Sequence, residues 1–309
     1  MEGYTMSNRR AFLKQSGLAA GALTMGLFPQ EMFASGELVK LIVLHTNDIH
    51  CHLDPFPDSD AEYPGRGGLV RLASLVAQCR AENPNLLLLD AGDMFQGTPY
   101  FNYFKGDLML KVMSKMGYDA GTIGNHEFDN GMGDILSALK FASFPLISSN
   151  YDFSDTILAG HVKTHDILKK GGVKIGIYGL GIELDGLVGK PNYGNTRYLD
   201  PLETALKMER RLKKDHSCDL VICLSHLGFS YTHSKISDSI LASQTKYTDL
   251  IVGGHTHTFL EKPLVLKNAV GNPILVNQTG WAALAAGKIE FVFDRKDKMK
   301  DPVVIVNNL

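Results

Sequence analysis

Cysteine is scarce in this chain, which has four among its 309 residues. The four positions, Cys51, Cys79, Cys218 and Cys223, form neither a C-x-x-C motif nor a dense framework. This spacing argues against the common cysteine-based zinc sites and against small disulfide-stapled folds. We interpret all four as unpaired thiols that serve mostly as small hydrophobic side chains.

An excess of positive charge is also lacking. The chain has 31 Lys and Arg against 33 Asp and Glu, a formal net charge of −2. Proteins that bind nucleic-acid polymers usually carry a basic stripe or patch, so no such partner is expected here. Small phosphate compounds stay open as ligands, because bound cations can supply positive charge locally.

A hydrophobic run long enough to cross a bilayer is the third absence. The apolar stretch at residues 17–28 has about 12 residues, whereas a spanning helix needs about 20. It follows Arg9 and Arg10, an order that resembles a twin-arginine export signal. We therefore expect residues 1–35 to be a signal segment that directs the protein to the periplasm. An uncleaved signal that tethers the protein to a membrane is the alternative.

The rest of the chain alternates between apolar runs and amphipathic segments. Its composition, 44% hydrophobic and 21% charged, is ordinary for a globular protein. The apolar runs are continuous and rich in Val, Ile and Leu, which is typical of strands buried on both faces. Strands are predicted at residues 38–44, 86–89, 121–123, 145–148, 173–180, 220–224, 250–252, 274–276 and 289–293.

Amphipathic segments between these runs predict helices. Residues 69–80 place Leu72 and Val76 on one apolar stripe. Pro201 suits a first helical turn, with Asp200 as its N-cap. The alternation of strands and helices predicts an α/β fold with packed sheets and outer helices. Helices are expected at residues 69–80, 100–116, 134–141 and 201–214.

Polar side chains follow five of the predicted strands directly. In open α/β sheets, binding sites form outside the carboxyl ends of strands, so one edge would collect these groups. Carboxylate oxygens, amide oxygens and imidazole nitrogens suit divalent metals. Two metals about 3.5–4 Å apart can clamp a phosphoryl group and activate a water. The residues are Asp48 and His50, Asp93, Asn125 and His126, His226, and His255 and His257.

The fuller sequence around these residues resembles a known family. Five segments look like the signature blocks of the calcineurin-like metallophosphoesterases: Asp48-Ile49-His50, Gly92-Asp93, Gly124-Asn125-His126-Glu127, His226 and Gly254-His255-Thr256-His257. The stretches HTNDIH, GGLVRLASLV, DAGDMFQGTP and GNHEFDNG resemble, more narrowly, the N-terminal catalytic domain of the 5′-nucleotidase and 2′,3′-cyclic phosphodiesterase family. The resemblance runs from about Leu41 to the end of the chain.

The resemblance implies a four-layer α-β-β-α sandwich with two central mixed sheets over residues 36–309. It implies two divalent metal ions as cofactors; mixed nitrogen and oxygen ligands admit zinc, manganese, iron or cobalt. Asp93 would bridge the two metals. The first metal would be bound by Asp48, His50, Asp93 and His257. The second would be bound by Asp93, Asn125, His226 and His255.

Two further residues take roles through the same resemblance. His126 would face the phosphoryl group without binding metal, and Asp129 would orient it and keep it charged. The implied reaction is hydrolysis of a small phosphate ester, expected to be a nucleotide, by attack of a metal-bridging hydroxide. A 2′,3′-cyclic-nucleotide phosphodiesterase is an alternative interpretation. A non-catalytic metal-binding module is disfavoured, because every expected ligand is present.

The chain departs from the two-domain members of this family in length. In those proteins a C-terminal domain stacks the nucleoside base, and this chain ends at Leu309, soon after the predicted strand at 289–293. We expect that domain to be absent, or to be supplied by a separate chain in a two-chain nucleotidase.

Several residues near the blocks are expected to have structural roles rather than to bind metal. Cys51 stands where the family commonly has a small residue, and we expect a spectator rather than an extra ligand or an oxidation-sensitive thiol. His45 is expected to be a strand residue, and Asp90 and Glu127 to shape turns. The proline- and glycine-rich segment 54–67 is a candidate rim or lid.

Overall fold

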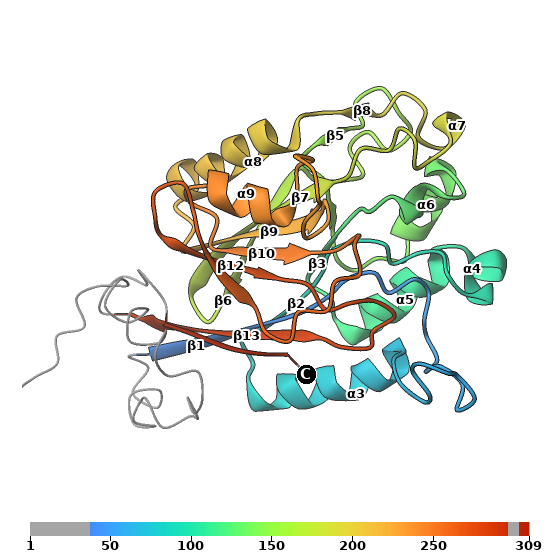
Figure 1. Cartoon of the computed structure of the whole chain (residues 1–309), viewed down its shortest axis with the longest axis horizontal. Helices are drawn as coiled ribbons and strands as arrows, with labels where there is room; N and C mark the ends of the chain where they lie inside the picture. Colours follow the sequence, from blue (N-terminus) through green and yellow to red (C-terminus); the bar gives the residue numbers. More distant parts are fainter. Residues whose placement is uncertain (1–37, 296–302, 309) are drawn as a thin grey trace, which may run out of the picture.

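The computed structural model of the protein describes residues 38–295 and 303–308. Two six-stranded sheets pack face to face, and helices cover their outer faces (Figure 1). The expected signal segment, residues 1–35, lies outside the described residues. Within the part that is described, no helix combines the length and the hydrophobicity that a membrane span requires.

The first sheet has the strand order β14-β13-β1-β2-β3-β4. Strands β1 to β4 are parallel, whereas β13 runs antiparallel to β1, and β14 runs antiparallel to β13. The sheet is therefore mixed, as expected. Its strands are β1 (Leu38–Thr46), β2 (Leu86–Asp90), β3 (Ala120–Thr122), β4 (Leu146–Ile147), β13 (Gly287–Asp294) and β14 (Val303–Asn308).

The second sheet has the strand order β11-β12-β10-β9-β7-β6 and is also mixed. Its four central strands are parallel, and the edge strands β6 and β11 run antiparallel to their neighbours. The strands are β6 (His165–Lys170), β7 (Val173–Gly181), β9 (Leu220–His226), β10 (Leu250–Gly253), β11 (Leu264–Lys267) and β12 (Pro273–Asn277). A separate two-stranded sheet pairs β5 (Tyr151–Asp152) with β8 (Arg197–Tyr198).

Helices fill the connections between the parallel strands. Helices packed on the first sheet include α3 (Leu69–Glu82), α4 (Pro99–Phe104), α5 (Asp107–Met116) and α6 (Met132–Leu139). Those packed on the second sheet are α8 (Pro201–Arg210), which continues as a π-helical turn (Arg211–Asp215), and α9 (Asp238–Gln244). The short elements are α7 (Lys190–Tyr193) and a 3₁₀ turn (His126–Phe128). The Asp200 side chain accepts a hydrogen bond from the backbone N–H of Glu203, which confirms the predicted N-cap.

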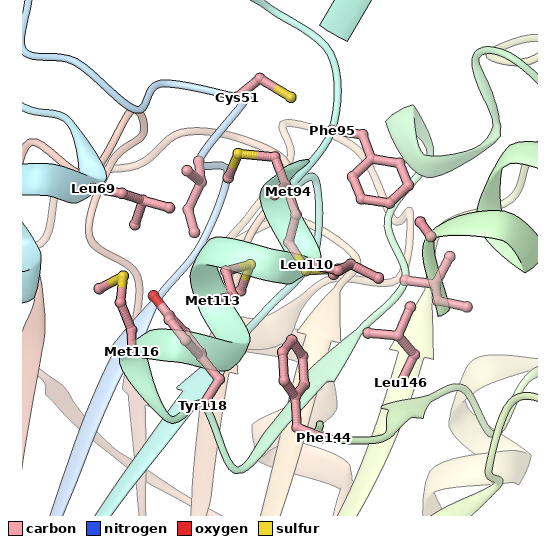
Figure 2. Packing of buried hydrophobic residues seen from close by; sticks show 14 of the residues in the cluster. Cys51, Leu69, Met94, Phe95, Leu110, Met113, Met116, Tyr118, Phe144 and Leu146 are labelled. Atoms are coloured by element: carbon pink, nitrogen blue, oxygen red, sulfur yellow. The ribbon is translucent and has the colours of Figure 1, made fainter. Parts of the chain in front are cut away.

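Alternate side chains of β1 show how the layers are joined. Leu41 and Val43 point into an apolar cluster between the two sheets, while Ile42 and Leu44 point into a second cluster under α3, α5 and α6. Figure 2 shows part of this second cluster, with Met113 of α5 beside other labelled core side chains. A third cluster lies between the second sheet and α8 and α9. The three clusters confirm the predicted α-β-β-α sandwich.

The predicted helix at 100–116 is wrong in one respect, since it is two helices, α4 and α5. Lys105 between them has a left-handed backbone (φ 53°). Gly106 follows, and a Cβ at that position would overlap the ring of Phe95. The chain therefore leaves the helical conformation at Lys105, and the glycine at 106 leaves room for the Phe95 ring. The helical periodicity of the sequence reveals neither feature.

Candidate metal centre

The carboxyl ends of five strands from both sheets meet at one edge and bring the seven predicted ligand residues together. Asp93 Oδ2 lies 2.9 Å from His226 Nε2. His257 Nε2 lies 3.4 Å from Asp48 Oδ1, and it lies 3.0 Å from His50 Nε2. Strands that belong to different sheets thus contribute side chains to a single cluster.

The cluster divides into two groups that could each hold a cation. One group is Asp48, His50 and His257, and the other is Asp93, His226 and His255; within each group the ligand atoms lie within 4.8 Å of one another. Asn125 joins the second group, because its Oδ1 lies 2.9 Å from His255 Nδ1. His50 Nε2 lies 4.0 Å from Asp93 Oδ2, so Asp93 faces both groups. This placement is the one expected of a bridging carboxylate.

Left-handed backbone aims most of these side chains inward. Non-glycine residues rarely adopt positive φ, and such strain clusters at functional sites. Five of the seven candidate ligands have it: Asp48 (50°), His50 (51°), Asp93 (55°), His255 (75°) and His257 (50°). Residue types alone give no sign of this conformation, so the sequence could not have revealed it.

Two glycines of the signature blocks leave room for the ligands. A Cβ on Gly124 would overlap Asp93 Oδ1 and would lie 2.7 Å from His226 Nε2. A Cβ on Gly254 would lie 2.8 Å from His226 Nδ1. These glycines are required because a methyl group would enter the space on which the donor atoms converge.

Hydrogen bonds from the surrounding backbone hold the ligands in place. His226 Nδ1 faces the carbonyl oxygen of Ala91 at 2.7 Å, which leaves Nε2 directed into the cluster. The backbone N–H of His255 donates to both oxygens of Asp48 at 3.0 Å. The backbone N–H of His126 donates to Asp93 Oδ1 at 2.8 Å. The ligand set is thus preorganised by the fold.

Glu127 and Asp90 act on turns, as predicted, and are not among the grouped donors. The buried Glu127 carboxylate accepts hydrogen bonds from four backbone N–H groups in two blocks, those of Asp93, Met94, Phe95 and Gly124. Asp90 accepts from the backbone N–H of Gly92 and from the hydroxyl of Thr46. Both carboxylates therefore shape the backbone that presents Asp93.

The electrostatics of the cluster fit divalent cations. Burial opposes a charge on His226, but the nearby carboxylates of Asp93 and Asp48 outweigh burial and raise the pKa of His226 to about 10. The buried carboxylates of Asp93 and Asp48 are therefore stabilised by a positive charge beside His226. A divalent metal supplies that charge and leaves the imidazole nitrogen free to act as a ligand. The donor set of carboxylates, imidazoles and one amide suits zinc, manganese, iron or cobalt.

His126 and Asp129 form a pair beside the donor atoms. His126 Nδ1 lies 2.7 Å from Asp129 Oδ2, and this hydrogen bond is the main reason that the pKa of His126 rises to about 9. The Asp129 carboxylate thus favours the charged form of the imidazole. Its ring lies 5.2 Å from that of His50, centroid to centroid. The pair therefore places a proton donor next to the candidate metal groups.

Trp281 is a neighbour of the site that the sequence did not reveal. Its indole stacks on the His257 ring at 5.6 Å with an interplanar angle of 5°. Phe56, from the segment 54–67, packs edge-on against the same indole at 5.6 Å. The predicted rim segment therefore does border the site. Trp281 is the chain's only tryptophan, but its position after Gly280 carries no recognisable motif.

The remaining expectations concern cysteine and histidine residues near the blocks. All four cysteines are free and buried, as predicted. Cys51 belongs to the cluster under α3 and α5 (Figure 2), and burial raises the pKa of its thiol to about 12. That environment favours the spectator role, which stays a prediction. His45 lies within β1, fully buried, and accepts a hydrogen bond from Asn277 Nδ2 at 2.9 Å, so it is the expected strand residue.

Comparison with known proteins places these features in a family. The profile of the calcineurin-like phosphoesterases matches residues 41–259. The 5′-nucleotidase of Rattus norvegicus is 33% identical over 273 residues, which is 86% of this chain and 44% of that protein. The snake venom 5′-nucleotidase of Naja atra is 35% identical over 230 residues, which is 72% of this chain and 42% of that protein.

A solved structure agrees with these sequence relatives. The 5′-nucleotidase precursor of Thermus thermophilus superposes with a TM-score of 0.78 at 33% identity, covering 88% of this chain and 54% of that one. The chain spans about half the length of the curated relatives that it matches. The matched region contains all seven candidate ligands together with His126 and Asp129. The chain therefore belongs to the calcineurin-like phosphoesterase family.

Proposed function

We propose that this protein is a metal-dependent phosphoester hydrolase that acts on nucleotides, as a 5′-nucleotidase does. The observation that carries the proposal is the convergence of two donor groups on one sheet edge, with Asp93 facing both. The relatives named 5′-nucleotidases support the substrate class, since they match across the region that holds these residues. The substrate alternative is a 2′,3′-cyclic nucleotide.

Seven residues of the chain would hold the two metal ions. Asp48, His50 and His257 would hold one metal, and Asp93, Asn125, His226 and His255 the other. When bound, two metals supply positive charge for the phosphoryl oxygens and lower the pKa of a bound water.

The pair of His126 and Asp129 would handle the leaving group. His126 Nδ1 is engaged by Asp129, so Nε2 is the atom that can donate a proton to the leaving oxygen. The carboxylate of Asp129 holds the ring in this orientation and favours its charged form.

Substitution of His126 tests this assignment. His126→Ala should lower kcat by about 10²- to 10⁴-fold, the usual contribution of a positioned general acid, while the metal content stays at two ions per chain. Metal analysis and rates on 5′-mononucleotides and 2′,3′-cyclic nucleotides would check both parts. His161→Ala, at an exposed position, is the control. A His126→Ala variant that loses metal, or that keeps the full rate, would refute the role.

We also propose that the protein is exported through its N-terminal segment. Arg9 and Arg10 before the apolar stretch at 17–28 support this proposal. Replacing both arginines with lysine should leave the protein in the cytoplasm, as fractionation of the host cells would reveal. Unchanged export of that variant would contradict the twin-arginine interpretation.

A further inference from the structure

The structure contains a cavity of about 340 Å³ whose lining includes none of the candidate ligands. It is bordered by the small sheet of β5 and β8, by the segment that follows β7, and by α7; Figure 1 shows β5, β8 and α7 together at one end of the molecule. None of the signature blocks contributes a lining residue. The charged and tyrosine residues of its lining are Tyr151, Glu183, Asp185, Lys190, Tyr193 and Tyr198.

The cavity shares its walls with the loop that carries His126 and Asp129. The ring of Tyr151 packs edge-on against Phe128, which stands between those two residues, at 5.7 Å. The side chain of Asn192, in α7, donates a hydrogen bond to the backbone carbonyl of Asp129 at 2.8 Å. Two elements that border the cavity, β5 and α7, therefore contact the turn that carries His126 and Asp129.

Strand register places the cavity at the same edge as the ligands. In the second sheet, Gly181 at the end of β7 pairs with His226 at the end of β9. Glu183 follows only two residues later and lines the cavity. The cavity and the donor atoms therefore lie beyond the carboxyl ends of the neighbouring strands β7 and β9.

The lining discriminates between kinds of ligand. Two carboxylates, Glu183 and Asp185, line the cavity together with one cation, Lys190, and all three side chains are exposed. The Nζ atom of Lys190 lies 4.4 Å from the centre of the Tyr193 ring. A phosphate group would be repelled by the pair of carboxylates, whereas hydroxyl groups can donate to them. The tyrosine rings offer apolar walls for a sugar or a base, and Tyr151 and Tyr198 pack against each other at 6.1 Å.

We propose that this cavity receives the leaving alcohol of the substrate, and that this alcohol is hydroxylated, as the ribose of a nucleotide is. Glu183 accepts hydrogen bonds from the sugar hydroxyls, and the tyrosines form the walls of the subsite. The inference rests on the proposed function and deepens it, because it assigns substrate selection to residues of this chain.

Substrate discrimination by a conservative variant tests the subsite. Glu183→Gln should raise KM about tenfold for both a nucleoside 5′-monophosphate and ribose 5-phosphate, since a hydrogen bond to a charged group contributes about 1.5 kcal/mol or more. KM for p-nitrophenyl phosphate, which lacks sugar hydroxyls, should change less than twofold. Asp185→Asn is a second variant, and Glu82→Gln, an exposed carboxylate at the end of α3, is the matched control.

The outcomes separate the subsite from the wider proposal. If the metal-loaded wild-type protein hydrolyses none of the three compounds, the proposed function fails and the subsite fails with it. If all three are hydrolysed and Glu183→Gln and Asp185→Asn affect them equally, or not at all, only the subsite is overturned. An effect confined to the nucleotide would overturn the assignment to the sugar, because ribose 5-phosphate carries the same 2- and 3-hydroxyls.

Discussion

The space between the two sheets and the edge at which their strands end are built on opposite principles. Between the sheets, regular strands bury an unbroken set of apolar side chains, such as Leu41 and Val43 of β1. Two residues beyond the end of the same strand, Asp48 is fully buried in a left-handed conformation among other polar groups. The region between the sheets has regular strand geometry and apolar side chains, whereas the edge has positive backbone φ angles and buried polar side chains.

The comparison indicates that apolar packing between the sheets stabilises the strained backbone of the ligand residues. A residue held in a sparsely populated backbone conformation costs about 1–3 kcal/mol and persists only where its surroundings fix it. Each fully buried aliphatic side chain contributes about 1.5–3 kcal/mol, so the intersheet core can tolerate several such residues. Variants at the edge should therefore damage binding, and variants between the sheets should damage stability.

The largest effect is expected at Gly124. A methyl group there would overlap Asp93 Oδ1, so Gly124→Ala should displace the ligands and lower kcat/KM by about 10³-fold or more, as a shift of about 1 Å at a reacting centre already costs about 10²-fold. Circular dichroism should show a folded protein. Gly133→Ala, where a Cβ meets nothing within 4 Å, is the control and should keep full activity. An active, metal-replete Gly124→Ala variant would break the comparison.

The opposite result is expected between the sheets. Ile177 of β7 is fully buried in the intersheet cluster, and Ile177→Ala should lower the free energy of unfolding by about 2–5 kcal/mol. At 25 °C the folded fraction should still bind its metals. Denaturant titration and metal analysis would measure the two quantities separately. Loss of metal by a fully folded Ile177→Ala protein would show that the two regions are not independent.

Low pH should destabilise the folded protein through His45, which lies near the end of β1, between the two regions. Burial lowers the pKa of His45 to about 3, whereas an unfolded histidine titrates near 6.5. The unfolded chain therefore takes up a proton first as the pH falls. Stability that is present above pH 6.5 is lost between about pH 6.5 and 3, on the order of 5 kcal/mol in all. His45→Gln should flatten this part of the pH profile of metal-free protein; exposed His161→Gln should not.

The smallest effect is expected at Cys51. Its thiol is 1% exposed and packs in the cluster under α3 and α5, so Cys51→Ser should change kcat/KM by less than about twofold. The backbone N–H of Gln96 stays available as a hydrogen-bond partner for the hydroxyl, so the exchange should lower the free energy of unfolding by only about 1 kcal/mol. Thermal unfolding and steady-state rates would measure both. A tenfold loss of activity with normal stability would make Cys51 part of the site.

Sequence reasoning succeeded where the physical signal is local and periodic. Continuous apolar runs located the central strands, because strands buried on both faces have no polar positions. The edge strands β6 and β11 were missed, since charged residues such as Lys169 and Lys267 interrupt their apolar character. The ligand residues were found because their side chains have distinctive chemistry and directly follow strands.

What escaped prediction depends on contacts between distant segments. The close packing of the Phe95 ring against Gly106 joins a loop to the start of α5, and the stacking of Trp281 on His257 joins residues from separate loops. The pairing of Tyr151 with Tyr198 likewise spans a long separation in the chain. Positive φ at ligand residues is imposed by the folded environment rather than by residue type.

The metal content of the protein with and without Asp93 tests the central claim most directly. After loading with manganese or zinc and removal of free ions, the wild-type protein should hold two ions per chain by elemental analysis. Asp93→Ala should hold at most one, since it removes the carboxylate that faces both donor groups. Fewer than two ions in the wild-type protein, or two retained at unchanged affinity in Asp93→Ala, would contradict the account.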